Sequence, residues 1–182
     1  MNGLRRFTDT FGHCTDRGLE SLGACPTLTS AHLYGWKGSM QGPLALISGK
    51  APISELVLTV KPIDDAFMQK AATLATLENL YVIGDRLSLD GVRCFLQARG
   101  LIRLSIESSE NLGPGIADLA EHPTLQDLCL WTYRFGKKDL DALKKLDRLH
   151  CLKLSCERFP RGILQAAGDC KNLVRLVLRG EL

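Results

Sequence analysis

The sequence lacks both a long hydrophobic run and a strong excess of charge of one sign. No window approaches the run of about 18 apolar residues that a membrane-spanning helix needs, and the N-terminal MNGLRRFTDT lacks the apolar core of a secretory signal. The 23 Lys and Arg residues against 20 Asp and Glu leave a formal net charge of only +3. Nucleic-acid binders usually cluster basic residues on one face. We therefore expect neither a membrane nor a nucleic acid as a partner.

Patterns typical of catalysis and metal binding are also missing. No glycine-rich loop of the phosphate-binding kind follows a strand-like segment, and no group of ligands has the spacing of a metal site. His13–Cys14 and His150–Cys151 are adjacent pairs, and adjacent residues on a strand point to opposite faces. We therefore expect no enzyme activity, no cofactor and no metal.

The seven cysteines do not form a disulfide framework. Their number is odd, and several fall in strand-like segments or at helix ends rather than in loops. Cys129 and Cys151 are expected on consecutive strands, offset by two positions, which puts their backbones beyond the roughly 7 Å limit for easy bridging. Cys25 and Cys170 are expected to fill the core at helix ends. Seven free thiols indicate a reducing, cytoplasmic setting.

A regular internal repeat organises the chain. The pattern L-x-x-L-x-L returns every 24 residues through six units, with an aliphatic residue at all three positions, and two weaker units precede them. Asp9 replaces the aliphatic residue at the sixth position of the first weak unit. Background composition does not produce such a register, so the repeat decides the architecture. The first positions of the six units are Ile53, Leu77, Leu101, Leu125, Leu149 and Leu173.

Each unit is predicted to contain one strand and one helix. Apolar residues alternate around L-x-L, as in a short strand with one buried face. Later in most units they are three apart, as at Leu164, Ala167 and Cys170, which is typical of a short helix with one buried stripe. Because no single coil can bury its own apolar face, the coils must stack. The sequence therefore predicts a single α/β domain over residues 1–182, a horseshoe-shaped solenoid with about eight parallel strands on its concave face and short helices on its convex face.

These units resemble the repeats of the leucine-rich repeat family, over nearly the whole chain. The subclass is indicated by residues 14–35, CTDRGLESLGACPTLTSAHLYG, and by residues 169–180, DCKNLVRLVLRG. Both are similar to the cysteine-containing repeats in substrate-binding arms of F-box proteins and in bacterial effectors that imitate them. Two features depart from the family: no asparagine ladder occupies the ninth position, and no F-box segment is present. The link to ubiquitin ligases is therefore an analogy of subclass.

The predicted binding residues follow from strand alternation. If the fourth and sixth positions face the core, the third, fifth and seventh positions point outward from the concave sheet. With the ninth position included, outward aromatic residues form two groups, and Trp, Tyr and Arg are frequent binding anchors. The alternative for each ring is a structural role, covering the edge of a neighbouring coil. The predicted binding residues are His32, Tyr34, Trp36, Tyr81, Arg103, Glu107, Trp131, Tyr133, Lys153 and Arg175.

The sequence thus favours a protein-interaction module that binds a macromolecular partner through its concave face, such as the recognition arm of a regulatory or effector protein. One alternative is a structural scaffold that associates through its open ends, and another is the non-catalytic part of a ubiquitin-ligase-type enzyme. The last strand, Leu173–Leu178, is predicted to present an apolar edge, so we expect either a longer natural chain or end-to-end self-association. An effector secreted without a classical signal is the alternative to a cytoplasmic protein.

Overall fold

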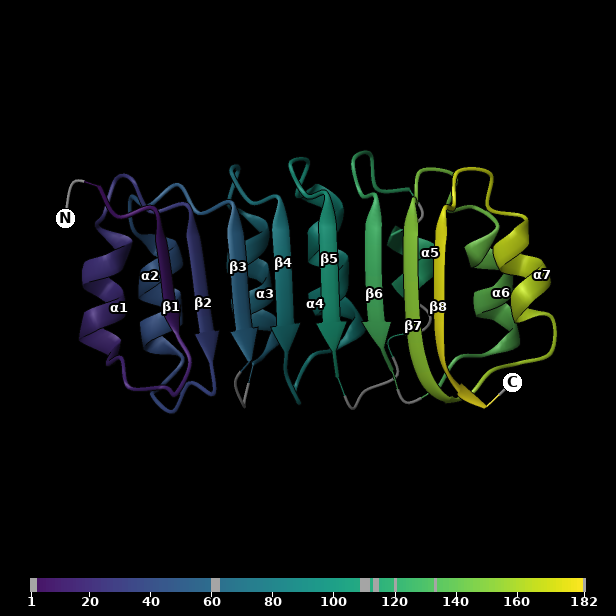
Figure 1. Ribbon diagram of the computed structural model, residues 1–182, viewed down its shortest axis with the longest axis horizontal. Coiled ribbons are helices and arrows are strands. Elements are labelled where there is room, and N and C mark those ends of the chain that lie inside the picture. Colours follow the sequence, from purple (N-terminus) through teal and green to yellow (C-terminus); the bar gives the residue numbers. More distant parts are fainter. Residues whose placement is uncertain are drawn as a thin grey trace.

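Eight parallel strands form one sheet, and the helices lie behind it in Figure 1. The computed structural model describes residues 3–59, 63–108, 112, 115–119, 121–132 and 134–181. The strands follow one another across the sheet in chain order: β1 (Arg6–Asp9), β2 (Ser30–Tyr34), β3 (Glu55–Thr59), β4 (Asn79–Ile83), β5 (Arg103–Glu107), β6 (Asp127–Trp131), β7 (Cys151–Arg158) and β8 (Arg175–Glu181). The predicted α/β solenoid with eight parallel strands is confirmed.

One helical segment connects each strand to the next. Thr15, Asp64 and Ser88 cap three of the helices, each accepting a hydrogen bond from a backbone N–H of the first turn. None of the helices in the described residues is long and apolar enough to cross a membrane. The helices are α1 (Asp16–Gly23), α2 (Gln41–Ser48), α3 (Asp65–Ala72), α4 (Leu89–Arg93) with the 3-10 helix η1 (Cys94–Gln97), α5 (Gly115–Leu119), α6 (Lys137–Leu143) and α7 (Ile163–Gly168).

The strands pair in the register that the repeat predicts. Leu104 of β5, for example, pairs with Leu128 of β6, which lies 24 residues further along the chain. The step from β2 to β3 is one residue longer, since Ala31 pairs with Leu56, yet the pairing continues without a break. The fourth and sixth repeat positions therefore stack on one another from strand to strand, and they form the buried face of the sheet.

The helices bury one stripe each against this face, but the predicted stripe of α7 is wrong at one position. Leu164 is 59% exposed, and Ile163 is buried in its place. Gly162 adopts a left-handed conformation, with φ of 94°, immediately before the helix begins. This turn sets the rotation of α7 so that Ile163, Ala166 and Ala167 face the core.

Polar side chains tie five of the coils to the coil before. In these five, the residue directly before the first repeat position donates a hydrogen bond to a carbonyl of the preceding coil, and in three of them this donor is a threonine hydroxyl at 2.8 Å. Arg148 and Asn172 take the same place in the last two coils and donate to the carbonyls of Pro123 and Asp147. These bonds join neighbouring coils in a chain that has no asparagine ladder. The threonines are Thr27, Thr76 and Thr124.

Asp9, which interrupts the apolar pattern, organises the turn after β1. Its carboxylate accepts hydrogen bonds from the backbone N–H groups of Phe11, Gly12, His13 and Cys14, at 2.8 to 3.2 Å. Burial alone would raise the pKa of Asp9, but the four N–H groups outweigh it and leave the pKa below its ordinary value. The first coil thus closes around a charge rather than around a leucine.

His122 is a titratable side chain buried in the core, at 1% exposure. Its Nδ1 accepts hydrogen bonds from the backbone N–H groups of Thr124 and Leu125, at 3.3 and 3.1 Å. The proton of the neutral ring therefore sits on Nε2. Burial lowers the pKa of His122, and the nearby carbonyls of Phe95 and Ala98 oppose this shift only in part.

Candidate binding groove on the open sheet face

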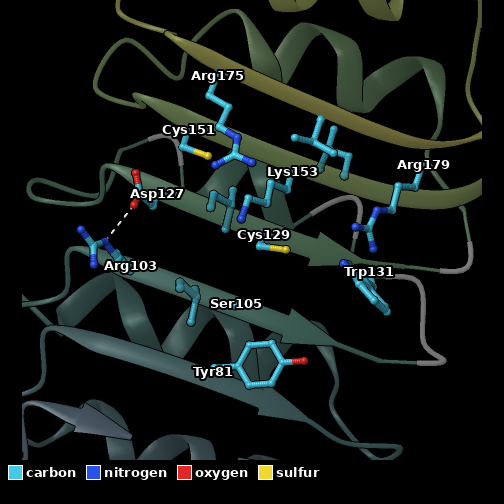
Figure 2. Close-up of a pocket in the computed structure, with 14 residues that line it drawn as sticks. Tyr81, Arg103, Ser105, Asp127, Cys129, Trp131, Cys151, Lys153, Arg175 and Arg179 are labelled. Atoms are coloured by element: carbon cyan, nitrogen blue, oxygen red, sulfur yellow. Dashed lines mark hydrogen bonds and ion pairs between the residues drawn. The ribbon is translucent and has the colours of Figure 1, made fainter. Parts of the chain in front are cut away.

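A groove of about 410 Å³ lies on the face of the sheet that the helices leave uncovered, which we call the open face (Figure 2). Its volume falls within the range of about 300–1,000 Å³ that is common for ligand pockets. It spans five strands, β4 to β8, so the side chains of five successive coils meet in it. The lining residues are Tyr81, Arg103, Leu104, Ser105, Asp127, Leu128, Cys129, Trp131, Cys151, Lys153, Leu154, Arg175, Val177 and Arg179.

Strand alternation brings half of the predicted binding residues together here. Tyr81, Arg103, Trp131, Lys153 and Arg175 all line the groove, each from a different strand. In Figure 2 their side chains rise on the same side of the sheet. Because the fourth and sixth positions point into the core, strand alternation directs the third, fifth and seventh side chains to the opposite face. The structure therefore places these five predicted residues in one continuous surface.

Trp131 and Arg179 meet at one end of the groove. The guanidinium carbon of Arg179 lies 5.6 Å from the centre of the Trp131 ring, which is within the range of a cation–π contact. The two residues are two strands apart, and the residue between them is Ser155, which pairs with both. The small side chain of Ser155 leaves room for Arg179 to reach across β7 to the ring.

The positive charges of the groove are unevenly compensated. Arg103 donates to Asp127 at 2.9 Å, but this pair is 65% and 37% exposed, so it adds little to stability. Lys153, Arg175 and Arg179 have no carboxylate within 4.0 Å among the residues that the structure describes. The end of the groove formed by β7 and β8 is therefore positively charged.

Tyr81 borders the groove on the side of β4. Burial raises the pKa of its hydroxyl, and the nearby Glu107 and Cys129 raise it further. The phenol is thus protonated at neutral pH and can both donate and accept a hydrogen bond. Glu107, another predicted binding residue, does not line the groove, but it is the register partner of Trp131 on β5 and adds a carboxylate beside it.

The N-terminal group of predicted binding residues is separate from the groove. Tyr34 packs edge-on against His32, with 6.1 Å between the ring centres. His32 Nε2 lies 3.4 Å from the Glu55 carboxylate, which also accepts a hydrogen bond from Ser30 at 2.8 Å. This hydrogen bond from Ser30 is the main reason why the pKa of Glu55 is lowered, followed by His32 and Arg6, while burial opposes the shift. His32 and Ser30 thus both contact the Glu55 carboxylate, so these three polar groups are paired within the protein.

The prediction for Trp36 is wrong, because its side chain lies in the core at 6% exposure. Gly35 has a φ of 61°, so the chain turns after β2, and strand alternation no longer applies two residues beyond the strand end. The indole Nε1 donates to the carbonyl of Ser39 at 3.1 Å. The ring also packs against Gly38 and Gly42, where a Cβ atom would collide with it. Trp36 therefore covers the edge of its coil, which was the alternative for each aromatic residue. Tyr133 lies outside the described residues.

Sequence reasoning missed Arg179 and Val177 as binding residues, together with Asp127. All three occupy the same outward positions as the predicted residues, so the signal was present in the strand pattern. The strand pattern could not predict the contact between Arg179 and Trp131, because Arg179 reaches the ring across an intervening strand.

Thiols also line the groove. Cys129 and Cys151 are on neighbouring strands, and the pairing of Asp127 with Cys151 confirms the predicted offset of two positions between them. No disulfide joins the seven cysteines, all of which lie in described residues. Within the described part of the chain, no group of three or more His, Cys, Asp or Glu side chains could hold a metal ion.

No known protein family matches the chain, and no curated protein sequence matches it either. The resemblance to leucine-rich repeat proteins therefore remains a prediction from the repeat pattern.

Proposed function

We propose that the chain is a protein-interaction module that binds a protein partner through the groove on its open face. The observation that carries this proposal is the composition of the groove. It joins Trp131 and Tyr81 to three basic side chains that lack a carboxylate neighbour in the described residues. Aromatic and arginine side chains of this kind dominate binding energies at protein interfaces. The leucine-rich repeat resemblance supports the same proposal, and with it the role of a recognition arm.

The shape of the surface supports a macromolecule rather than a small molecule. The groove crosses five strands and is open to solvent, while its walls come from side chains of successive coils. A small ligand in a site of this kind would leave much of its surface exposed, whereas most small-molecule sites enclose their ligand. An extended segment of a partner can contact several coils at once.

Site-specific photocrosslinking tests the proposal. Ser105, which lines the groove, would be replaced by photoreactive p-benzoylphenylalanine, and the same residue would replace the exposed Glu20 of α1 as a matched control. We expect a protein of defined mass to be crosslinked in cells from position 105 and not from position 20. Crosslinking from both positions, or from position 20 alone, would contradict binding through the open face.

A second candidate function is a scaffold that associates through the coil containing β8. Val174 is 88% exposed there, and Leu176 and Leu178 are only half-buried, although their counterparts in inner coils are buried. Exposed apolar groups of this kind favour association. Sedimentation velocity of the intact protein and of Val174→Asp tests this candidate. Self-association that the substitution abolishes would support it, and a monomer at high protein concentration would exclude it.

A further inference from the structure

Three basic side chains surround Val177 on the open face. Lys153 lies next to Val177 on the sheet, because the two are register partners on β7 and β8. Arg175 and Arg179 lie two residues to either side of Val177 on the same strand, so all four side chains project from one face. At about 3.3 Å per residue, the backbones of Arg175 and Arg179 are about 13 Å apart. We call these four residues the basic patch.

The positive charge of the basic patch favours binding of an anionic group. None of its three cations has a carboxylate within 4.0 Å in the described residues, so no ion pair offsets their mutual repulsion. Arg175 and Arg179 are exposed and Lys153 is half-buried, so an incoming group can reach all three. A surface of this kind attracts and orients a partner of opposite charge.

Arg179 is held in a position suited to bind a carboxylate. Its guanidinium carbon lies over the ring of Trp131, 5.6 Å from the ring centre, and this cation–π contact restricts its orientation. A guanidinium presents five N–H donors in a planar fork, which can form a two-point hydrogen bond to a carboxylate. Part of the entropy cost of ordering a long side chain is therefore met before the partner arrives.

We infer that the partner presents an acidic peptide segment to the groove, an inference that rests on the proposed function. Asp or Glu side chains of the segment contact Lys153, Arg175 and Arg179, and an apolar side chain contacts Val177. The Arg179 guanidinium lies over Trp131 on β6, so a segment that contacts both it and Arg175 crosses the strands in the direction of the groove.

The groove favours a peptide over a nucleic acid because carboxylates border it as well. Asp127 lines the groove, and Glu107 is the register partner of Trp131. A nucleic acid carries a phosphate on every nucleotide, so phosphates next to the bound ones would approach these two carboxylates. A peptide can place neutral or basic residues there instead.

Selection from a library of random dodecapeptides on the intact protein tests this inference. We expect the selected peptides to be enriched in Asp and Glu. In fluorescence anisotropy, the triple variant Lys153→Gln, Arg175→Gln, Arg179→Gln should bind them at least about tenfold more weakly, since each substitution removes a charge-assisted contact. The control triple variant Arg17→Gln, Lys50→Gln, Arg161→Gln removes the same charge from exposed positions outside the groove, and it should bind as the unaltered protein does. Thermal unfolding of both variants checks that they fold.

The outcomes separate this inference from the proposed function. Peptides that lose binding with Trp131→Ala but show no acidic enrichment would overturn the inference and leave the proposed function standing. Peptides that bind equally well to Trp131→Ala and to the groove triple variant would overturn both, as would a failure to select any peptide. Binding of an oligothymidylate that depends on the basic patch would overturn the inference in favour of a nucleic acid.

Discussion

Arg179 covers the ring of Trp131 from two strands away, with 5.6 Å between the guanidinium carbon and the ring centre. Ser155 lies between them in the register of the sheet and is small enough to let the arginine pass. The contact links β6 to β8 on the outside of the sheet, where the binding surface lies. It also means that the tryptophan is partly covered before any partner arrives.

The first prediction concerns this tryptophan. Trp131→Ala should weaken partner binding by about 2 kcal/mol or more, the usual range for an aromatic anchor. It should leave the midpoint of thermal unfolding nearly unchanged, because the side chain lies on the open face and is only half-buried. The peptides selected on the intact protein, or a crosslinked partner, supply the binding measurement.

Trp36→Ala is the matched control, because the same side chain is removed from the core. It should lower the free energy of unfolding by about 3–5 kcal/mol, as is usual for buried aromatic residues. Urea denaturation of both variants compares them directly. If Trp131→Ala loses stability and keeps its binding affinity, Trp131 is a structural support, and the groove loses its proposed anchor.

The second prediction concerns Asp9. Asp9→Asn should lower the free energy of unfolding at neutral pH by about 1–3 kcal/mol, because an amide cannot accept all four N–H groups. The folded state lowers the pKa of Asp9, so its stabilisation is fully present above the unfolded value near 3.8. The difference between the two proteins should therefore shrink as the pH falls through the folded pKa. An equal difference at all pH values would show that the carboxylate charge plays no part.

The third prediction concerns His122. Because burial lowers its pKa in the folded state, the unfolded chain binds more protons below about pH 6.5, and the free energy of unfolding should decrease as the pH falls below that value. His122→Asn keeps an acceptor for the two N–H groups but does not titrate. Its stability should decrease less between pH 7 and pH 5 than that of the unaltered protein. If the free energies of unfolding of the two proteins, from urea denaturation, change equally with pH, the titration of His122 does not cause the loss of stability.

The fourth prediction concerns the thiols. After denaturation without reductant, a thiol reagent should titrate all seven cysteines, since no disulfide joins them. In the folded protein, the half-buried Cys14, Cys94, Cys129 and Cys151 should react faster than the buried cysteines. Fewer than seven thiols in the denatured protein would contradict the reducing setting that the cysteine pattern indicates. The buried cysteines are Cys25, Cys156 and Cys170.

The repeat predicted the sheet correctly because the strands of the inner coils all bury the same two positions. Leu128 and Leu130, for instance, are fixed by their stacked neighbours, and their alternation leaves Cys129 and Trp131 on the open face. The prediction failed where a local turn resets the direction of the chain. Gly35 turns Trp36 into the core, and Gly162 rotates α7 so that Leu164 faces outward.

Charge pairing on the open face follows from the register between repeats and not from the pattern within one strand. Arg103 and Arg175 occupy the same position in their repeats, yet only Arg103 has an aspartate beside it, Asp127 on the next strand. The residue facing Arg175 on β7 is Cys151. Which cations remain available to a partner thus depends on sideways neighbours that are 24 residues away in the chain, and not on the local pattern.

The longer step between β2 and β3 shows that the repeat tolerates an insertion between two strands. One additional residue enters between these strands, and the sheet pairs on either side of it as though it were not there. Insertions of this kind can therefore arise in the connecting segments without disturbing the strands. The outward residues of one coil can likewise mutate while its leucines stay in place. Selection can then act on the chemistry of the surface and on the stability of the coil as two nearly independent traits.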